Sequence, residues 1–357
     1  MKNNKIIEVE GLTFDDLLLL PSYSEIKREE INLSVRLSQN IKLEIPLLSS
    51  PMDTVTTSEM AISMGKLGGL GVIHRNMTIE KQEAEVAKTK ENVPLVAAAV
   101  GVGKDMEERM AALTKAGLDL VVVDSAHGYS KTVIEATRFI SSHYPSIYLV
   151  SGNVATPEGA KALIDAGSQA IRVGMGPGSI CTTRIVTGIG VPQVTAIMDT
   201  AAIAKEREVL VIADGGIRFS GDIVKALAVG ASLVMLGSLI ASAKESPGKV
   251  VEQNGKKFKS YRGMGSVEAM REGSAIRYGQ EYRIGQENKL TEEGVSGLVP
   301  YKGDLEAIIT KLVGGVRSGM YYSGAKNINE LHARAKLIKI SKASLIESHP
   351  HNIKINI

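Results

Sequence analysis

The sequence predicts an α/β protein built as a (β/α)8 barrel. Three observations support this fold class. Eight short runs rich in Val, Ile, Leu and Ala recur along the chain, each ends in a small or polar residue, and stretches with helical spacing lie between them. Continuous apolar strands that alternate with helices are typical of a parallel sheet buried on both faces, and eight such units close into a barrel.

The eight predicted strands end in residues that change the direction of the chain. In order, they are IPLLSS (45–50), GLGVIH (69–74), LVAAAVG (95–101), LDLVVVDS (118–125), IYLVSGN (147–153), QAIRVG (169–174), VLVIADGG (209–216) and SLVMLGS (232–238). A doubly wound open sheet is the alternative fold. A Rossmann domain, however, would carry GxGxxG in its first strand-to-helix turn, and no such motif occurs there.

Helices are predicted between the strands, for example over 105–117, 156–167 and 220–230. Each of these stretches closes on Ala-Gly or Val-Gly, as expected of a glycine C-cap, and Thr156 and Ser220 fit N-caps. A further helix is predicted over DLEAIITKLVGG (304–315).

Two segments lie outside the eight repeats. Residues 1–44 form an N-terminal extension that we expect to pack against the barrel. After the eighth strand, about 60 residues precede the helix at 304–315, and they include the polar, glycine-containing stretch 271–297. Loops of this length are usually functional lids or disordered, and we predict a lid over the rim of the barrel.

Composition excludes several classes of protein. The 357 residues are 44% hydrophobic, which is enough for a large core, and the net charge is only +3, with no long run of Lys or Arg. Only 4% are aromatic and none is Trp, so a nucleic-acid partner is not expected. The single cysteine cannot form an internal disulfide, MKNNKIIEVEG lacks a signal-peptide core, and the apolar runs are too short to cross a membrane. We expect a cytoplasmic protein.

In a barrel, chemistry lies at the carboxyl ends of the strands, and the only cysteine, Cys181, follows the sixth strand in RVGMGPGSICTTR (172–184). A lone cysteine is usually a small buried hydrophobe. Here the preceding GMGPGS offers too little side chain to bury anything, so a loop that wraps a ligand or an ion is favoured. Positive charge from Arg184 or a following helix start could activate the thiol.

The loops after strands seven and eight are the usual phosphate site of this fold, and GGI (215–217) and GSLIAS (237–242) supply backbone N–H groups there. A phosphate-bearing substrate is therefore predicted. Asp124 and Asp214 also end strands, where each is either a ligand-binding carboxylate or a cap of the next helix. The six histidines include no HExxH pair, and a zinc site is not expected.

Seven motifs occur in order along the chain, namely SSPMDTV (49–55), GNVAT (152–156), VGMGPGSICTTR (173–184), GVPQ (190–193), ADGGIR (213–218), YRGMGS (261–266) and EEGVSG (292–297). Together they resemble the IMP dehydrogenase family, which oxidises inosine 5′-monophosphate (IMP) to xanthosine 5′-monophosphate (XMP) with NAD+, the committed step of guanine nucleotide synthesis. The resemblance runs from about residue 12 to residue 353. Most of the family carries a pair of CBS modules after the second strand. Here HRNMTIEKQEAEVAKTKENV (74–93) leads straight to strand three, which implies one catalytic domain over 1–357, without the insert near 88–94 and with a mobile flap over about 266–302.

The resemblance implies a reaction in two steps. Cys181 matches the nucleophile that attacks C2 of the purine; hydride then leaves for the nicotinamide, and water hydrolyses the covalent thioimidate. Arg277 and Tyr278 match the flap pair that activates this water, with Thr183 as a further contact. A second pair, Tyr282-Arg283, is the alternative alignment.

The resemblance also implies three sets of binding residues. Those matching contacts to IMP or XMP are Ser50, Met52, Ser179, Asp214, Gly216, Gly237, Ser238, Tyr261, Gly263, Met264, Gly265 and Glu293. Those placed where the family binds NAD are Asp124, Ser125, Asn153, Gly174 and Gly176. The carbonyls of Gly176, Gly178 and Cys181, with Glu347, Ser348 and His349 from a neighbouring subunit, match a K+ site in a homotetramer.

Two other functions stay open at this stage. GMP reductase has the same barrel and a cysteine in the same CTTR setting, but it lacks the long flap with an Arg-Tyr pair. A nucleotide-binding module without turnover is the other alternative, and the presence of Cys181, Thr183, Arg277 and Tyr278 together argues against it.

Overall fold

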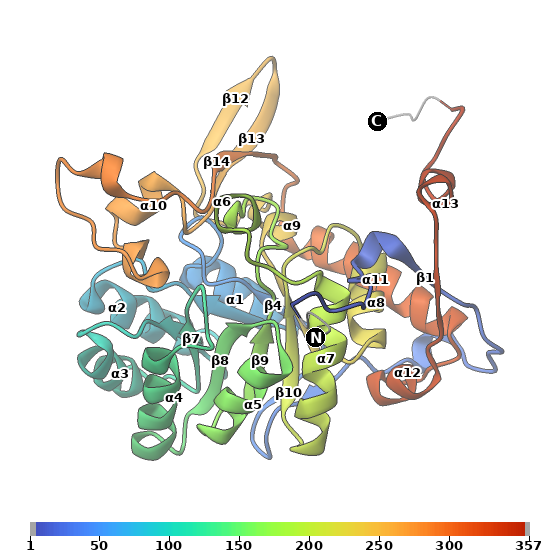
Figure 1. Cartoon of the computed structure of the whole chain (residues 1–357), viewed down its shortest axis with the longest axis horizontal. Coiled ribbons are helices and arrows are strands. Elements are labelled where there is room, and N and C mark those ends of the chain that lie inside the picture. The colour runs from blue at the N-terminus through green and yellow to red at the C-terminus, as the bar shows by residue number, and fades with distance from the viewer. Residues whose placement is uncertain (1–4, 354–357) are drawn as a thin grey trace.

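Eight parallel strands close into a barrel in the computed structural model, which describes residues 5–353 (Figure 1). The strands are β4 (Leu47–Ser49), β5 (Leu70–Ile73), β6 (Ala97–Val100), β7 (Leu120–Asp124), β8 (Tyr148–Val154), β9 (Ala170–Val173), β10 (Leu210–Asp214) and β11 (Leu233–Leu236). Each coincides with a predicted strand. Because β11 pairs with β4, the sheet has no free edge, which confirms the barrel and makes the open-sheet alternative wrong.

The barrel strands are apolar without alternation because they are covered on both faces. Every residue of β5, β6, β7, β8, β9 and β11 is buried. Helices surround them, namely α1 (Ser58–Lys66), α2 (Ile79–Lys90), α3 (Met106–Lys115), α4 (Lys131–His143), α5 (Pro157–Asp165), α7 (Gln193–Glu206) and α8 (Ser220–Ala228). No helix within residues 5–353 is both long enough and apolar enough to cross a membrane.

The predicted helix ends are mostly confirmed. Gly117, Gly167 and Gly230 adopt positive φ angles of 96°, 101° and 118° just after α3, α5 and α8, and the Thr156 side chain accepts a hydrogen bond from the amide of Gly159 at 3.3 Å. The prediction for Ser220 is wrong. Ser220 is the first residue of α8, and the Asp222 carboxylate accepts from the backbone amides of Arg218 and Phe219.

The N-terminal extension packs on the barrel as expected, although its first four residues lie outside the described part of the chain. Its elements are η1 (Phe14–Asp16), β1 (Leu17–Leu19), η2 (Arg28–Glu30) and the hairpin of β2 (Val35–Arg36) and β3 (Lys42–Leu43). Phe14 is 1% exposed, and β1 pairs with β15 (Leu337–Lys339) near the other end of the chain.

A three-stranded antiparallel sheet, which the sequence analysis did not predict, follows the eighth barrel strand and the short helix α9 (Ser238–Ala241). It consists of β12 (Val250–Gln253), β13 (Lys256–Arg262) and β14 (Ser296–Pro300), and the β12–β13 hairpin projects away from the barrel (Figure 1). The flap lies between β13 and β14 and contains α10 (Val267–Arg271), η3 (Ser274–Tyr278) and η4 (Glu287–Lys289).

The last part of the chain returns to the barrel and then leaves it. The helix predicted over 304–315 extends further, as α11 (Leu305–Tyr322). The glycine at the end of the predicted range, Gly315, lies inside α11 and does not end it. A Cβ on Gly315 would lie 2.5 Å from Cβ of Ser220, so the glycine lets α11 approach α8 closely. The short helices α12 (Ile328–Arg334) and α13 (Lys342–Glu347) follow, and α13 stands apart from the body of the molecule in Figure 1.

Candidate active site

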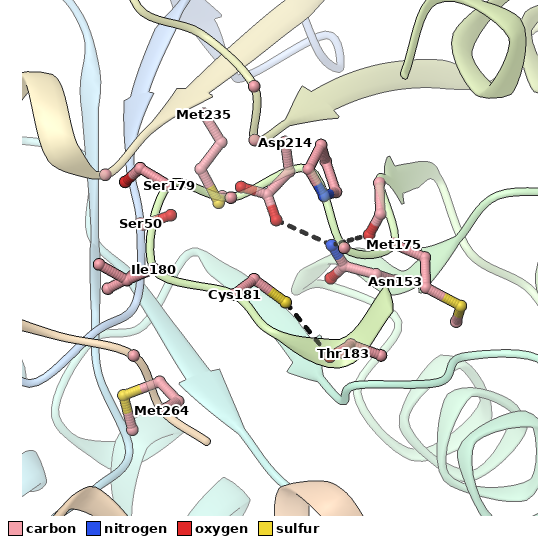
Figure 2. A pocket seen from close by; sticks show the side chains of 18 of the residues that line it. Ser50, Asn153, Met175, Ser179, Ile180, Cys181, Thr183, Asp214, Met235 and Met264 are labelled. Atoms are coloured by element: carbon pink, nitrogen blue, oxygen red, sulfur yellow. Dashed lines mark hydrogen bonds between the residues drawn. The ribbon is translucent and has the colours of Figure 1, made fainter. Parts of the chain in front are cut away.

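The loop that carries Cys181, residues 174–183, lies beside Asp214, the last residue of the neighbouring strand β10 (Figure 2). Gly215, which follows β10, has a φ of 92°, and a Cβ there would lie 2.8 Å from Cγ of Pro177. The glycines of both segments therefore allow two backbones to meet at the rim. This contact brings the Cys181 loop to the turn that sequence analysis assigns to a phosphate.

Cys181 itself is partly exposed, and its thiol lies 3.2 Å from the hydroxyl of Thr183, to which it donates (Figure 2). Thr183 begins the short helix α6 (Thr183–Thr187), so the cysteine directly precedes the N-cap, Thr182. The predicted charge neighbour, Arg184, lies close enough to Cys181 to interact with it electrostatically, and it also has a structural task. Its guanidinium donates to the carbonyls of Met175 at 3.2 Å and Val191 at 2.5 Å, which links the start of the loop to the segment that leads into α7.

Backbone hydrogen bonds join the Cys181 loop to two distant segments. The amide of Thr182 donates to the carbonyl of Glu293 at 3.0 Å, and the amide of Glu293 in turn links this segment to the second one by donating to the carbonyl of Gly265 at 3.0 Å. A Cβ on Gly263 would lie 3.1 Å from the carbonyl oxygen of Ile180. The motifs YRGMGS and EEGVSG thus supply glycines and backbone amides that stack against the loop.

A buried arginine, Arg172, links the two predicted carboxylates. Its guanidinium donates to Asp124 on one side and to Asp214 at 2.9 Å on the other, and its side chain is only 4% exposed. Neither aspartate caps the following helix: the N-caps of α4 and α8 are Ser130 and Phe219. The capping alternative is therefore wrong for both.

Sequence analysis did not single out Arg172, although a signal was present. An arginine inside the apolar strand QAIRVG must be buried, and a buried charge requires a partner.

Asn153 orients Asp214 from the end of β8. Its Nδ2 donates to the Asp214 carboxylate at 2.8 Å and to the carbonyl of Gly174 at 2.9 Å (Figure 2). Its Oδ1 is buried and accepts no hydrogen bond from residues 5–353. This oxygen is available to a ligand that carries a donor group.

The flap places Arg277 and Tyr278 at the same cavity. Arg277, on η3, forms an ion pair with Asp124, its carbonyl accepts from the amide of Ala126 at 3.2 Å, and its side chain is 11% exposed. Burial lowers the pKa of Arg277 and raises the pKa of Tyr278. The alternative pair lies elsewhere: Tyr282 bonds to Glu287, and Arg283 pairs with Glu281 while 68% exposed.

One cavity of about 350 Å³ collects most of the predicted site residues. This volume is at the lower end of the usual range for small-molecule sites. The predicted residues that line it are Ser50, Met52, Ser125, Asn153, Gly174, Gly176, Gly178, Ser179, Cys181, Thr183, Asp214, Gly216, Gly237, Ser238, Tyr261, Gly263, Met264, Arg277, Tyr278 and Glu293.

Five predicted residues do not line this cavity. Asp124 lies beneath it, 2% exposed, and Gly265 lies behind Tyr278, because a Cβ there would be 2.8 Å from Cζ of that ring. Glu347, Ser348 and His349 are at the end of α13, where the ring of His349 lies 6.1 Å from that of Phe219. They do not join the cavity of their own chain.

The N-terminal extension contributes lining residues that sequence analysis missed. Thr13 and Asp15 reach the end of the cavity beside Gly216, together with Arg218, whose guanidinium pairs with Asp15. Phe14 supports the same turn, since a Cβ on Gly216 would lie 3.4 Å from its ring. No sequence motif signalled these contacts, because they depend on how residues 13–15 return to the rim.

The fold and the rim define a class: a (β/α)8 barrel whose site lies at the carboxyl ends of its strands. The family follows from comparison with known proteins. A family model described as IMP dehydrogenase / GMP reductase domain matches residues 11–351. The chain belongs to this family.

Several curated relatives are named inosine-5′-monophosphate dehydrogenase. The protein of Borreliella burgdorferi is 45% identical over 400 aligned residues, which cover 98% of this chain and 98% of the relative. The proteins of Aquifex aeolicus and Staphylococcus saprophyticus are 40% and 39% identical, with 97% and 99% of this chain and 96% and 98% of the relatives covered.

Proposed function

We propose that this protein is an IMP dehydrogenase, which oxidises IMP to XMP with NAD+. One observation carries the proposal: Cys181 with its partner Thr183, and the flap pair Arg277-Tyr278, line a single cavity at the barrel rim. Relatives that are 39–45% identical to this chain and are named inosine-5′-monophosphate dehydrogenase support it.

The phosphate end of IMP lies at the glycine turn after β10 and at the start of α9. Gly216, Gly237 and Ser238 offer backbone and hydroxyl donors there, and Ser179 reaches the same end from the Cys181 loop. Burial raises the pKa of Tyr261, so its hydroxyl stays protonated and can donate to a phosphate oxygen. Asp214 accepts the ribose hydroxyls, because Asn153 and Arg172 hold its carboxylate in place.

Around the base, Ser50, Met52, Gly263, Met264, Gly265 and Glu293 orient the purine ring, and C2 lies at Cys181. In the first step the Cys181 thiolate adds to C2, and the hydride on C2 leaves for the nicotinamide, which gives NADH and a covalent thioimidate. Addition comes first because C2 of a purine donates hydride poorly until a nucleophile has bonded to it.

In the second step water attacks C2 of the thioimidate, the C–S bond breaks, and XMP is released. The water must lose a proton, and neutral Arg277 accepts it, with Tyr278 and Thr183 beside the reacting atoms. Arginine is a base only where its cation is destabilised, and burial of Arg277 acts in that direction.

NAD+ supplies the hydride acceptor and occupies the side of the cavity that the flap covers. Asp124, Ser125, Asn153, Gly174 and Gly176 would hold it. The unpaired Oδ1 of Asn153 fits a ligand with a donor group, whereas Asp124 is free for a ribose only after Arg277 leaves. The dinucleotide and the closed flap therefore cannot occupy the site at the same time. Hydride transfer must come first, and hydrolysis follows after the dinucleotide has left and the flap has closed.

A monovalent cation, K+, would stabilise the Cys181 loop through the carbonyls of Gly176, Gly178 and Cys181. Carbonyl oxygens suit such a hard cation. Glu347, Ser348 and His349 would complete its shell in a neighbouring subunit, which is consistent with their position at the end of α13, away from their own cavity. A cytoplasmic homotetramer is part of this proposal.

The chain would act as one catalytic domain over 1–357 without CBS modules. The alignment with the Aquifex relative is 474 residues long, whereas this chain has 357, so that relative has more than a hundred positions with no counterpart here. In this chain α2 ends at Lys90 and β6 begins at Ala97, which leaves only a short connection near 88–94.

Absorbance at 340 nm tests the proposal. Purified protein is mixed with IMP, NAD+ and K+ in one cuvette and with GMP and NADPH in a second. Appearance of NADH in the first supports the dehydrogenase, and loss of NADPH in the second alone would show a GMP reductase. No change in either, together with binding of IMP by calorimetry, would favour a nucleotide-binding module without turnover.

A further inference from the structure

A second arginine, Arg75, lies beside the ion pair that docks the flap. It follows β5, and its side chain is 13% exposed. Its Nε lies 4.0 Å from Oδ2 of Asp124, the same oxygen that Arg277 contacts, whereas Arg172 occupies Oδ1. Three guanidiniums thus surround one carboxylate that is 2% exposed.

Arg75 is held in place although its Nε forms no hydrogen bond within residues 5–353. A Cβ on Gly101, just after β6, would lie 2.8 Å from Nη1 of Arg75, so the glycine provides the space in which the guanidinium lies. Its Nε is buried and has no hydrogen-bond partner within residues 5–353, and the same is true of Nε of Arg277. Buried donors are rarely left unpaired, and two on facing guanidiniums require an explanation.

The charges around Arg75 and Arg277 do not cancel. Asp124 and Asp214 supply two negative charges against Arg75, Arg172 and Arg277. On α3, Asp105 also faces Arg75, but it already pairs with Arg109, whose guanidinium further donates to Gln82 and to the carbonyl of Met77. Tyr278 adds no negative charge, because burial raises its pKa. One positive charge is therefore in excess when the flap is closed.

We propose that Arg75 is a positioning residue that acts through Arg277: by crowding the same oxygen of Asp124, it favours the neutral form of Arg277 in the closed flap. This inference rests on the proposed function, in which neutral Arg277 accepts the proton of the hydrolytic water. Burial first, and then the charge of Arg277, lowers the pKa of Arg75 to about 10. Because repulsion between two cations is reciprocal, Arg75 also disfavours the charged form of Arg277.

The test compares Arg75→Gln, which removes the charge, with Arg75→Lys, which retains it. In Arg75→Gln, Arg277 holds its proton more strongly, so the rise of steady-state turnover with pH moves to higher pH, and turnover at pH 8 falls about ten-fold. Arg75→Lys stays within about three-fold of the wild type at pH 8, because a cation is still present. The NADH burst from IMP and NAD+ keeps its rate within about two-fold in both variants, since hydride transfer takes place with the flap open.

A double variant separates this role from a structural one. In an Arg277→Ala background, Arg75→Gln should change turnover by less than about two-fold at any pH. An unshifted pH profile in Arg75→Gln, an equal loss at every pH, or a rise in the KM for NAD+ alone would overturn the inference. Failure of the proposed function looks different, because the wild-type protein would then give no NADH burst at all.

Discussion

The Cys181 loop and the flap face one cavity, yet they are held by different contacts. The segment around Cys181 is braced by two side chains: Arg184 donates to the carbonyls of Met175 and Val191, and Gln193 of α7 donates to the carbonyls of Val173 in β9 and Asp214 in β10, both at 3.0 Å. The flap enters the cavity through η3, and from Gly279 to Glu292 no residue is buried. The thiol of Cys181 is thus fixed, whereas the guanidinium of Arg277 belongs to a segment that can move out of the cavity.

This difference matches the two steps of the proposed reaction. Hydride transfer needs Cys181 and an open dinucleotide site, and hydrolysis needs Arg277 in the closed position. The segment with few buried contacts is the one that the reaction requires to move. The first step should therefore tolerate damage to the flap, and the second should not.

Removal of the thiol should have the largest effect. Cys181→Ala should lower steady-state turnover by at least about a thousand-fold, because no covalent intermediate can form. Binding of IMP, measured by calorimetry, should persist, because the phosphate and ribose contacts are elsewhere. NADH production at an undiminished rate would contradict the role of Cys181 as nucleophile.

The stability of the protein should depend on Arg172, which lies at the rim beneath the Cys181 loop. In Arg172→Gln, the buried carboxylate of Asp124 and the partly exposed carboxylate of Asp214 lose a shared partner, and we expect the free energy of unfolding to fall by about 3–5 kcal/mol. Denaturant unfolding followed by circular dichroism measures this loss. Arg207→Gln is the matched control, since Arg207 is 52% exposed and 3.6 Å from Asp165, and its change should stay within about 0.5 kcal/mol. Equal losses in the two variants would show that the buried ion pairs of Arg172 contribute no more to the free energy of unfolding than an exposed pair does.

A substitution in the flap should slow the second step of the reaction and spare the first. Arg277→Ala should keep the burst of NADH seen by stopped-flow absorbance and lower steady-state turnover about a hundred-fold, because the hydrolytic water loses its base. Arg283→Ala is the control for the alternative alignment, and its turnover should remain within about two-fold of the wild type. A large effect in Arg283→Ala, or loss of the burst in Arg277→Ala, would reverse the assignment.

A smaller effect concerns the base of the flap. His74, 5% exposed, accepts from the amide of Asn76, whose side chain bonds to Asp53 and to the carbonyl of Ala269 in α10. Burial lowers the pKa of His74 to about 4, whereas the unfolded chain titrates near 6.5.

The unfolded state therefore binds more protons than the folded state between these two values. As pH falls from about 6.5 to about 4, this residue should remove up to about 3 kcal/mol of stability. Denaturant unfolding at several pH values should show a shallower slope in His74→Asn than in the wild type. The same slope in both would mean that His74 is not the titrating group.

The barrel could be predicted from the sequence because the pattern that indicates each strand is local. Each strand is a short apolar run that ends at the rim, and the strand ends share one edge of the sheet, so the strand pattern alone predicts that Cys181, Asp214 and Asn153 lie near one another. The sheet of β12, β13 and β14 was missed although QNGKK (253–257) carries the Asn-Gly signal of a tight hairpin, and Asn254 and Gly255 have φ angles of 52° and 70°.

Other features depend on long-range packing. Arg75 and Arg277 are far apart in the chain, and only the closed flap brings them to one oxygen of Asp124. Thr13 and Asp15 reach the cavity because η1 folds back onto the turn after β10. A periodic pattern cannot report such contacts, since they join segments without a common repeat.

The most direct test of the two-step account is the mass of the Arg277→Ala protein, quenched in acid shortly after it is mixed with IMP, NAD+ and K+. The account predicts that most chains carry one covalently bound nucleotide and that peptide mapping places it on Cys181. An unmodified Cys181 peptide in a sample that has produced NADH would contradict the account.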